Sequence, residues 1–306
     1  MMGPENGSAT VLPLPDYRDK SAEVAERFRR IYERPVVLNI CDVGKVFETD
    51  RGPVTALDRI SFRAHRRELI CVIGASGCGK STLARIVAGL DAPTSGRVLL
   101  GDREVRGPGR DRGMVFQTYT LFPWRTVLEN VMFGLEVGGS SRHSAEEEAR
   151  EWIEVVGLGR FAGAYPHELS GGMKQRVAIA RALANQPRVL LMDEPFGALD
   201  AQTRAEMQGY LLQIWKIVDV TVLFVTHDLD EAVYLADRIL VMGPHPGHLL
   251  EVVEVPLERP RRPAQLESPL FLATRRHLEA LIYGSRVRTT ELLPRFRFTQ
   301  AGDDVE

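Results

Sequence analysis

Residues 68–90, ELICVIGASGCGKSTLARIVAGL, join three local patterns that together decide the fold. The first seven residues are a short apolar run, which predicts a buried strand, and STLARIVAGL predicts a helix. Between them GASGCGKS, residues 74–81, matches the phosphate-loop pattern in the strand–loop–helix context that this pattern requires. The order predicts an α/β nucleotide-binding fold.

The loop also predicts which atoms of a nucleotide its residues contact. Its glycines let backbone N–H groups wrap around the β-phosphate without Cβ clashes. We expect Lys80 to reach the β- and γ-phosphates and Ser81 to ligate Mg²⁺. Cys78 is interpreted as a small loop residue and not as a nucleophile. The predicted nucleotide-binding residues of the loop are Gly74, Ala75, Ser76, Gly77, Cys78, Gly79, Lys80, Ser81 and Thr82.

Composition narrows the class of protein. The chain has 306 residues, a net charge of -2 and a pI near 6.4, so it lacks the overall basic charge expected of a nucleic-acid-binding protein. Its three cysteines form no CxxC pair, which suits a reducing compartment. No apolar run approaches the ~18 to 20 residues that span a bilayer, and the N-terminus lacks a signal-peptide pattern. We therefore expect a soluble, cytoplasmic protein that reaches a membrane only through a partner.

Strands and helices alternate from Val36 onward, as in a parallel α/β sheet. Further strands are predicted at 96–102, 113–117, 188–195 and 220–228. The mainly helical sequence between Gln117 and Arg188 predicts an inserted lobe. SAEEEAREWIEVVGL is expected to open on a capping box of Ser144 and Glu147.

Both ends of the chain differ from this core. Residues 1–18 suggest a disordered leader, and 20–35 predict a helix with an apolar face that packs on a neighbouring surface. Its apolar face and its two ion pairs would be made by Val24, Phe28 and Ile31, and by Glu23 with Arg27 and Glu26 with Arg30. We therefore divide the chain into an N-terminal extension (1–35), a nucleotide-binding domain (36–255, with a helical subdomain at about 121–187) and a C-terminal extension (256–306).

A second candidate phosphate seat lies in LSGGMKQRVAIARAL, residues 169–183. Ser170, Gly171 and Gly172 stand at the start of a strongly helical run. The first N–H groups of a helix lack partners and carry the positive end of its dipole, so they favour an anion. One nucleotide-binding chain thus carries two phosphate seats far apart in sequence.

Polar residues that end two apolar runs predict the hydrolytic chemistry. VLLMDEP places Asp193 and Glu194 at the end of a buried strand, where adjacent carboxylates are costly unless a cation or water uses them. Asp193 is the candidate Mg²⁺ partner, and Glu194 is the candidate general base; a helix-capping role is the alternative for Glu194. His227, at the end of another apolar run, can donate to a γ-phosphate, with a structural histidine as the alternative. Gln117 can reach the Mg²⁺ or the attacking water.

These motifs, in this order, resemble the nucleotide-binding domain of an ATP-binding cassette (ABC) transporter over roughly residues 36–255. The resemblance implies a RecA-like core, an antiparallel β subdomain and an inserted helical subdomain. It also implies an ATPase that uses ATP and Mg²⁺ and works as a homodimer. In that family LSGG is the signature motif, matched by Leu169, Ser170, Gly171 and Gly172, and it caps the γ-phosphate held by the other subunit.

Other positions take their expected roles from the same resemblance. Phe47 matches the aromatic residue that stacks on adenine, with an exposed turn residue as the alternative. Ala198, Leu199 and Asp200 match the D-loop, which crosses the dimer interface. The loop after Gln117 receives the coupling helix of a membrane permease in the family. Its candidate contacts, which could instead pack the helical lobe internally, are Phe122, Pro123 and Trp124.

The wording FQ…LFPWRTVLENV and the RPRRP stretch resemble the nitrate/sulfonate/taurine-type importers. This implies permease subunits, an extracytoplasmic solute-binding protein as an indirect partner, and a peripheral position on the cytoplasmic face of the inner membrane. Rival interpretations are a soluble ABC ATPase of DNA repair or ribosomes and another P-loop enzyme such as a kinase. The transported solute is not encoded in an ATP site. The arginine run is expected to be a solvated linker face, with anionic lipid as the alternative partner of Arg259, Arg261 and Arg262.

Overall fold

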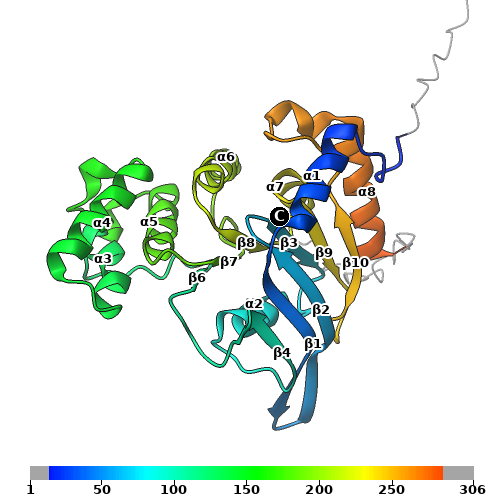
Figure 1. The fold of residues 1–306 in the computed structure, drawn as a ribbon, viewed down its shortest axis with the longest axis horizontal. Helices are drawn as coiled ribbons and strands as arrows, with labels where there is room; N and C mark the ends of the chain where they lie inside the picture. The colour runs from blue at the N-terminus through cyan, green and yellow to red at the C-terminus, as the bar shows by residue number, and fades with distance from the viewer. Residues whose placement is uncertain (1–13, 285–306) are drawn as a thin grey trace, which may run out of the picture.

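A computed structural model describes residues 14–284, so predictions that fall on residues 1–13 and 285–306 lie outside the described residues. A six-stranded sheet runs through the middle of the fold (Figure 1). Only the edge strand β10 is antiparallel to its neighbour. In spatial order the strands are β10 (Leu249–Glu254), β9 (Arg238–Met242), β3 (Leu69–Gly74), β8 (Thr221–Val225), β7 (Val189–Asp193) and β6 (Arg112–Val115).

A second, antiparallel sheet packs beside the first and encloses helix α2 (Lys80–Ala88). Apolar residues of β1, β2 and β4 share one buried cluster with α2 and with one face of β3. This arrangement fixes the start of α2 against both sheets. The strands, in spatial order, are β2 (Gly52–His65), β1 (Val36–Thr49), β4 (Ser95–Leu100) and β5 (Arg103–Glu104).

A group of helices lies apart from the sheets, at the left of Figure 1. Its members are α3 (Val127–Val137), α4 (Arg142–Val155) and α5 (Gly171–Ala184), with short turns η1 (Gly159–Phe161) and η2 (Pro166–Glu168). The predicted capping box at Ser144 is wrong. The Ser141 hydroxyl accepts from Ser144 N, so α4 begins earlier and Ser144 lies within it.

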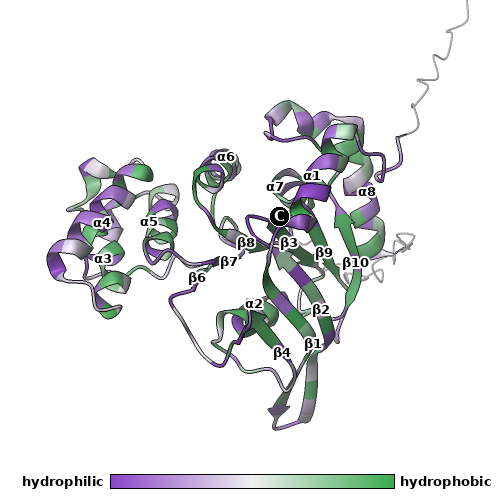
Figure 2. Cartoon of the chain, viewed as in Figure 1, coloured by the Kyte–Doolittle hydropathy of each residue, from purple (hydrophilic) through white to green (hydrophobic). Residues whose placement is uncertain are grey.

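The remaining helices lie outside this group, and among them α7 and α8 contact strands β3 and β9 of the central sheet. They are α6 (Ala201–Ile217), α7 (Leu229–Leu235), η3 (Pro263–Glu267), α8 (Pro269–Tyr283) and α1 (Ala22–Glu33). In Figure 2 strand β9 is mainly green and α1 mainly purple, as expected for a fully buried strand and an amphipathic surface helix. Among residues 14–284 no helix has the length and apolarity to cross a bilayer.

The predicted N-terminal helix is confirmed as α1, with Val24, Phe28 and Ile31 buried. The predicted pair of Glu26 with Arg30 forms at 2.7 Å. The other predicted pair does not form, because Arg27 turns inward. Its guanidinium donates to Leu257 O at 2.6 Å and Val255 O at 2.8 Å, so the helix is attached to the chain just after β10.

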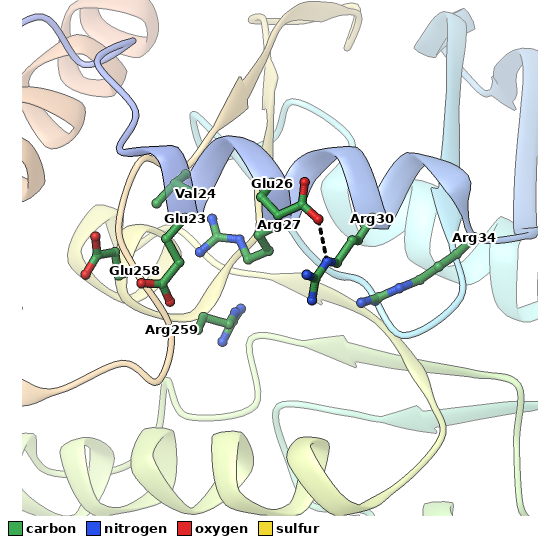
Figure 3. A pocket seen from close by; sticks show the side chains of 8 residues that line it. All are labelled: Glu23, Val24, Glu26, Arg27, Arg30, Arg34, Glu258 and Arg259. Carbon is green, nitrogen blue, oxygen red and sulfur yellow. Dashed lines mark hydrogen bonds and ion pairs between the residues drawn. The ribbon is translucent and has the colours of Figure 1, made fainter.

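Two of the three residues in the arginine run, Arg259 and Arg261, do not form a solvated face, which corrects the sequence prediction; Arg262 is exposed, as that prediction expects. Arg261 is buried and donates to the backbone oxygens of Tyr234, Leu257, Glu258 and Ala236. The neighbouring Arg259 donates to the buried Asp237 at 2.8 Å. Arg27 and Arg259 line a pocket of about 300 Å³, and Figure 3 shows their side chains beside α1. The two terminal extensions therefore pack on one another.

Candidate active site

The phosphate loop joins β3 to α2, as predicted, so its position follows from the central sheet. Gly77 and Gly79 have φ values of 78° and 94°, in the left-handed region that favours glycine. A Cβ on Gly79 would lie 2.6 Å from Leu57 Cδ2 and 2.9 Å from Ala56 O. Glycine is therefore required where the loop passes beneath β2.

Lys80 is buried within this loop. Its Nζ donates to Gly74 O at 2.9 Å and to Ala75 O at 3.0 Å, so the ammonium lies where the loop carbonyls converge. Burial raises the pKa of the neighbouring Cys78 thiol, and a nucleophilic cysteine needs the opposite shift. This direction supports the interpretation of Cys78 as a small loop residue.

Ser81 and Asp193 meet at the carboxyl ends of β3 and β7. The Ser81 hydroxyl donates to Asp193 Oδ1 at 3.0 Å. Burial raises the pKa of Asp193, and the bond from Ser81 opposes this rise. Hydroxyl and carboxylate oxygens are ligands that Mg²⁺ prefers, together with substrate phosphates. In residues 14–284 no group of three His, Cys, Asp or Glu is arranged to hold a metal ion.

Glu194 and His227 come together at the ends of β7 and β8. The distance from His227 Nδ1 to Glu194 Oε2 is 3.2 Å. Glu194 has φ 47°, a left-handed backbone that is uncommon for a residue with a side chain, and its N–H donates to Val225 O at 2.9 Å. A Cβ on Gly197 would be 3.8 Å from Glu194 Oε2 and 3.4 Å from Gln117 Nε2. Three of the four predicted catalytic side chains, those of Glu194, His227 and Gln117, therefore lie around one small region.

The helix predicted to carry the second phosphate seat is α5, and it begins at this motif. Ser170 is the N-cap residue, and its hydroxyl accepts from Met173 N at 3.3 Å. A Cβ on Gly172 would lie 2.8 Å from Thr203 Cγ2, so the glycine allows α5 to lie against α6. Figure 1 places α5 beside α3 and α4 and apart from α2. The two seats consequently do not face one phosphate within a single chain.

Phe47 lies near the end of β1 and is 38% exposed, which leaves its ring accessible to a planar group. The Nζ of Lys45 lies 4.9 Å from the ring centroid. The geometry thus satisfies both alternatives from the sequence, an adenine platform and an exposed aromatic residue.

The two aromatic residues predicted as permease contacts after Gln117 have different environments in the structure. Phe122 packs against Phe133, with ring centroids 4.7 Å apart, and the buried Asn130 holds its backbone through Oδ1 and Nδ2. Trp124, in contrast, is 71% exposed. Phe122 therefore belongs to the helical lobe, whereas Trp124 is available to a partner.

Several polar residues near the site were missed by the sequence prediction. Asn130 and Arg181 fix the loop after Gln117, and Arg181 donates to Thr120 O at 2.8 Å. Arg204 on α6 and Glu231 on α7 contact Asp228 and Thr226, the residues on either side of His227. The place of Arg204 just after the D-loop could have indicated it. The other three residues belong to no recognised motif, because their roles depend on contacts between segments that are distant in the sequence.

Glu231 gives a testable pH dependence. It is buried, accepts from Thr226 Oγ1 and from Gln208 Nε2, and burial raises its pKa from 4.5 to about 7. The folded protein binds the proton of the Glu231 carboxyl more tightly than the unfolded chain does. Protonation of Glu231 therefore contributes fully to stability below pH 4.5, and this contribution is lost as the pH rises through about 7. Glu231→Gln should remove this loss, worth up to about 3 kcal/mol at ~1.4 kcal/mol per pKa unit.

Urea unfolding of Glu231→Gln and the natural protein at about pH 5 and pH 8 measures this effect. The variant should gain stability relative to the natural protein as the pH rises. Glu151→Gln, at an exposed site on α4, is the control and should show no such trend. Parallel pH curves for Glu231→Gln and the natural protein would contradict the assignment.

Comparison with known proteins gives concordant matches. A family model described as ABC transporter matches residues 57–197. The chain is 47% identical to a nitrate import ATP-binding protein of Synechocystis, over 84% of this chain and 98% of the relative. It is 43% identical to an aliphatic sulfonates import ATP-binding protein of Bacillus cereus, over 83% of this chain and 100% of the relative. A dimeric ATP-binding cassette, solved in a post-hydrolysis state with ADP and phosphate, is 33% identical, with a TM-score of 0.63 over 71% of this chain and 98% of that one.

Proposed function

This chain belongs to the ATP-binding subunits of ABC transporters, and on that premise we propose that it dimerises on ATP to power import of a small anion or sulfonate-type solute through a separate permease. It is an ATPase of that family. The observation that carries the proposal is the meeting of Glu194 and His227 beside Ser81 and Asp193, while helix α5, which would supply the second phosphate seat, lies apart from α2 in the same chain (Figure 1).

In the proposed reaction Glu194 accepts a proton from the water that attacks the γ-phosphate. His227, 3.2 Å from that carboxylate, is placed to donate to a γ-phosphate oxygen. Lys80 exchanges its carbonyl partners for the β- and γ-phosphates. Ser81, Asp193 and Gln117 would hold Mg²⁺, which neutralises charge on the transferred phosphoryl group.

Dimerisation explains why one chain needs two phosphate seats. A seat of neutral N–H donors is weak alone, since a helix terminus contributes roughly 0.3 to 2 kcal/mol. Between two subunits packed head to tail, the N-terminus of α5 of one would cap the phosphate bound by Lys80 of the other. To change the ratio of closed to open dimers from 1:99 to 99:1, ATP must bind the closed form more favourably by roughly 5.5 kcal/mol. Two phosphates, each held from both sides, make that difference attainable.

A permease contact is proposed at the surface around Trp124. Beside it a groove of about 640 Å³ is lined in part by Phe122, Phe133 and Val137. A helix with an apolar face is the expected occupant of such a groove. Closure of the dimer would then move the permease through the loop that also contains Gln117.

Trp124→Ala should therefore weaken assembly with the permease. We expect at least a tenfold loss of affinity, about 1.4 kcal/mol, because exposed aromatic anchors dominate such interfaces. The ATPase rate of the isolated subunit should change by less than about twofold, since surface substitutions usually cost little. Ile217→Ala, a residue 70% exposed on α6, is the matched control. Equal permease recovery for both variants would remove Trp124 from the interface.

The rest of the assignment follows from the same proposal. The ATPase would sit on the cytoplasmic face of the inner membrane, attached to the permease, with an extracytoplasmic solute-binding protein as an indirect partner. We retain the division into an N-terminal extension (1–35), an ATP-binding domain (36–255) and a C-terminal extension (256–306). The named relatives import nitrate and aliphatic sulfonates, which supports an anionic solute.

The proposal is tested by a mild-detergent pull-down of the tagged Glu194→Gln protein with Mg-ATP from its own cells. Recovery of a multi-span permease at about one chain per ATPase subunit would support it. A soluble dimer without a membrane partner would favour the alternative, a soluble ABC ATPase that is not coupled to a permease.

A further inference from the structure

Arg204 lies between the D-loop and the loop that carries His227. Its Nη2 donates to Leu199 O at 3.0 Å, inside the segment Ala198–Asp200. Its Nη1 lies 3.6 Å from Asp228 Oδ2, the carboxylate of the residue that follows His227. One side chain therefore contacts both the segment expected to face the partner subunit and the neighbour of a catalytic residue.

Asp228 is itself fixed in place. It is the N-cap of α7, and its Oδ1 accepts from Glu231 N at 3.1 Å. Its own N–H donates to Thr226 Oγ1 at 3.0 Å. The backbone on both sides of His227 is thus held, and a displacement of Asp228 displaces the imidazole.

A second contact joins the same two helices. Gln208, one turn after Arg204 on α6, donates from Nε2 to Glu231 Oε1 at 3.2 Å. Since α6 begins directly at the D-loop, with Asp200 as its N-cap, this helix and α7 form one connected unit. Movement at the start of α6 is therefore transmitted to the His227 loop.

We propose that Arg204 is a positioning residue that couples the D-loop to His227, so that contact with the partner subunit keeps the imidazole in its place beside Glu194. Arg204 touches no reacting atom and acts through Asp228. The inference rests on the proposed dimeric ATPase, and it adds a route by which each site senses that the partner subunit is seated.

The pair of Arg204 and Asp228 is about one-third exposed on each side, so it contributes little to folding stability. A loss of activity on breaking it should therefore come without a comparable loss of stability. The chain also offers a matched ion pair on α7. Arg275 Nε lies 3.0 Å from Asp230 Oδ1, but Arg275 belongs to α8 and is not bonded to the D-loop.

The test compares the ATPase kinetics of full-length Arg204→Gln, Asp228→Asn and the double variant. Asn is as good an N-cap as Asp, so Asp228→Asn removes the charge and keeps the cap. Each single variant should lower kcat about tenfold, with KM for ATP changed less than about threefold. The rate should also depend less steeply on ATP concentration, approaching the non-cooperative dependence of independent sites. The double variant should be no worse than either single one, because both remove one interaction.

Arg204→Lys should recover part of the rate, and Arg275→Gln should match the natural protein. Additive losses in the double variant, or natural kcat and steepness in Arg204→Gln, would overturn the inference. His227→Ala separates this failure from that of the proposed function. If His227→Ala is inactive while Arg204→Gln has the natural rate, the inferred coupling role of Arg204 is disproved and the proposed catalytic site stands. If His227→Ala hydrolyses ATP normally, the proposed catalytic site itself fails.

Discussion

Glu194→Gln is expected to bind ATP, to accumulate as a stable dimer and to hydrolyse ATP at least 100-fold more slowly than the natural protein. Glutamine matches glutamate in size, so the backbone at φ 47° and the position beside His227 should be kept. What is lost is the proton acceptor for the attacking water, and general-base catalysis is typically worth about 10²- to 10⁴-fold. With hydrolysis stopped, the ATP that joins the two subunits remains in place.

Steady-state phosphate release measures the turnover, and sedimentation with Mg-ATP measures the dimer. Glu206→Gln removes a carboxylate from the exposed surface of α6 and is the control, with a rate close to that of the natural protein. Brisk hydrolysis by Glu194→Gln would take Glu194 out of the general-base role. Slow hydrolysis without a dimer would keep that role and count against ATP as the link between subunits.

Ser170→Asp should abolish turnover while leaving the fold intact. Aspartate is as good an N-cap as serine, and it is favoured at the positive end of a helix, so α5 should keep its start. Its carboxylate, however, occupies the seat that would receive the γ-phosphate of the partner's ATP. At an effective dielectric of 20, like charges 4 Å apart repel by about 4 kcal/mol, so we expect at least a 100-fold loss.

Ser170→Asn provides the matched comparison, because asparagine is an equally good but neutral cap. It should retain a substantial part of the rate. Both variants should unfold at similar temperatures, and both should bind ATP as monomers, since Lys80 is unaltered. If Asp and Asn at this position behave alike, the N-terminus of α5 does not act as an anion seat.

The parts of the fold that could be predicted are those specified by local sequence. Buried parallel strands appear as short apolar runs, so β3, β7 and β8 were located from 68–74, 188–195 and 220–228. The spacing of Val24, Phe28 and Ile31 gave α1 and its buried face. The phosphate loop was found because its backbone demands glycine at fixed positions.

The remaining features depend on contacts that local sequence does not specify. Arg259 and Arg261 look like a charged linker, yet their partners are a buried carboxylate and backbone carbonyls supplied by other elements. The helical spacing predicts an ion pair for Arg27, but the backbone carbonyls after β10 accept from it instead. For Glu231 the decisive property is burial on α7, where Gln208 of α6 donates to it, and a single sequence does not reveal this.

The central claim is that each ATP is hydrolysed between the phosphate loop of one subunit and the α5 terminus of the other. The most direct measurement mixes two inactive variants, Lys80→Ala and Ser170→Asp, and assays ATP hydrolysis. In a head-to-tail dimer the mixed pair contains one site with both defects and one with none. Random mixing should then restore about a quarter of the natural rate if the sites act independently. No recovery, with mixed dimers demonstrated by tag exchange, would contradict a site shared between subunits.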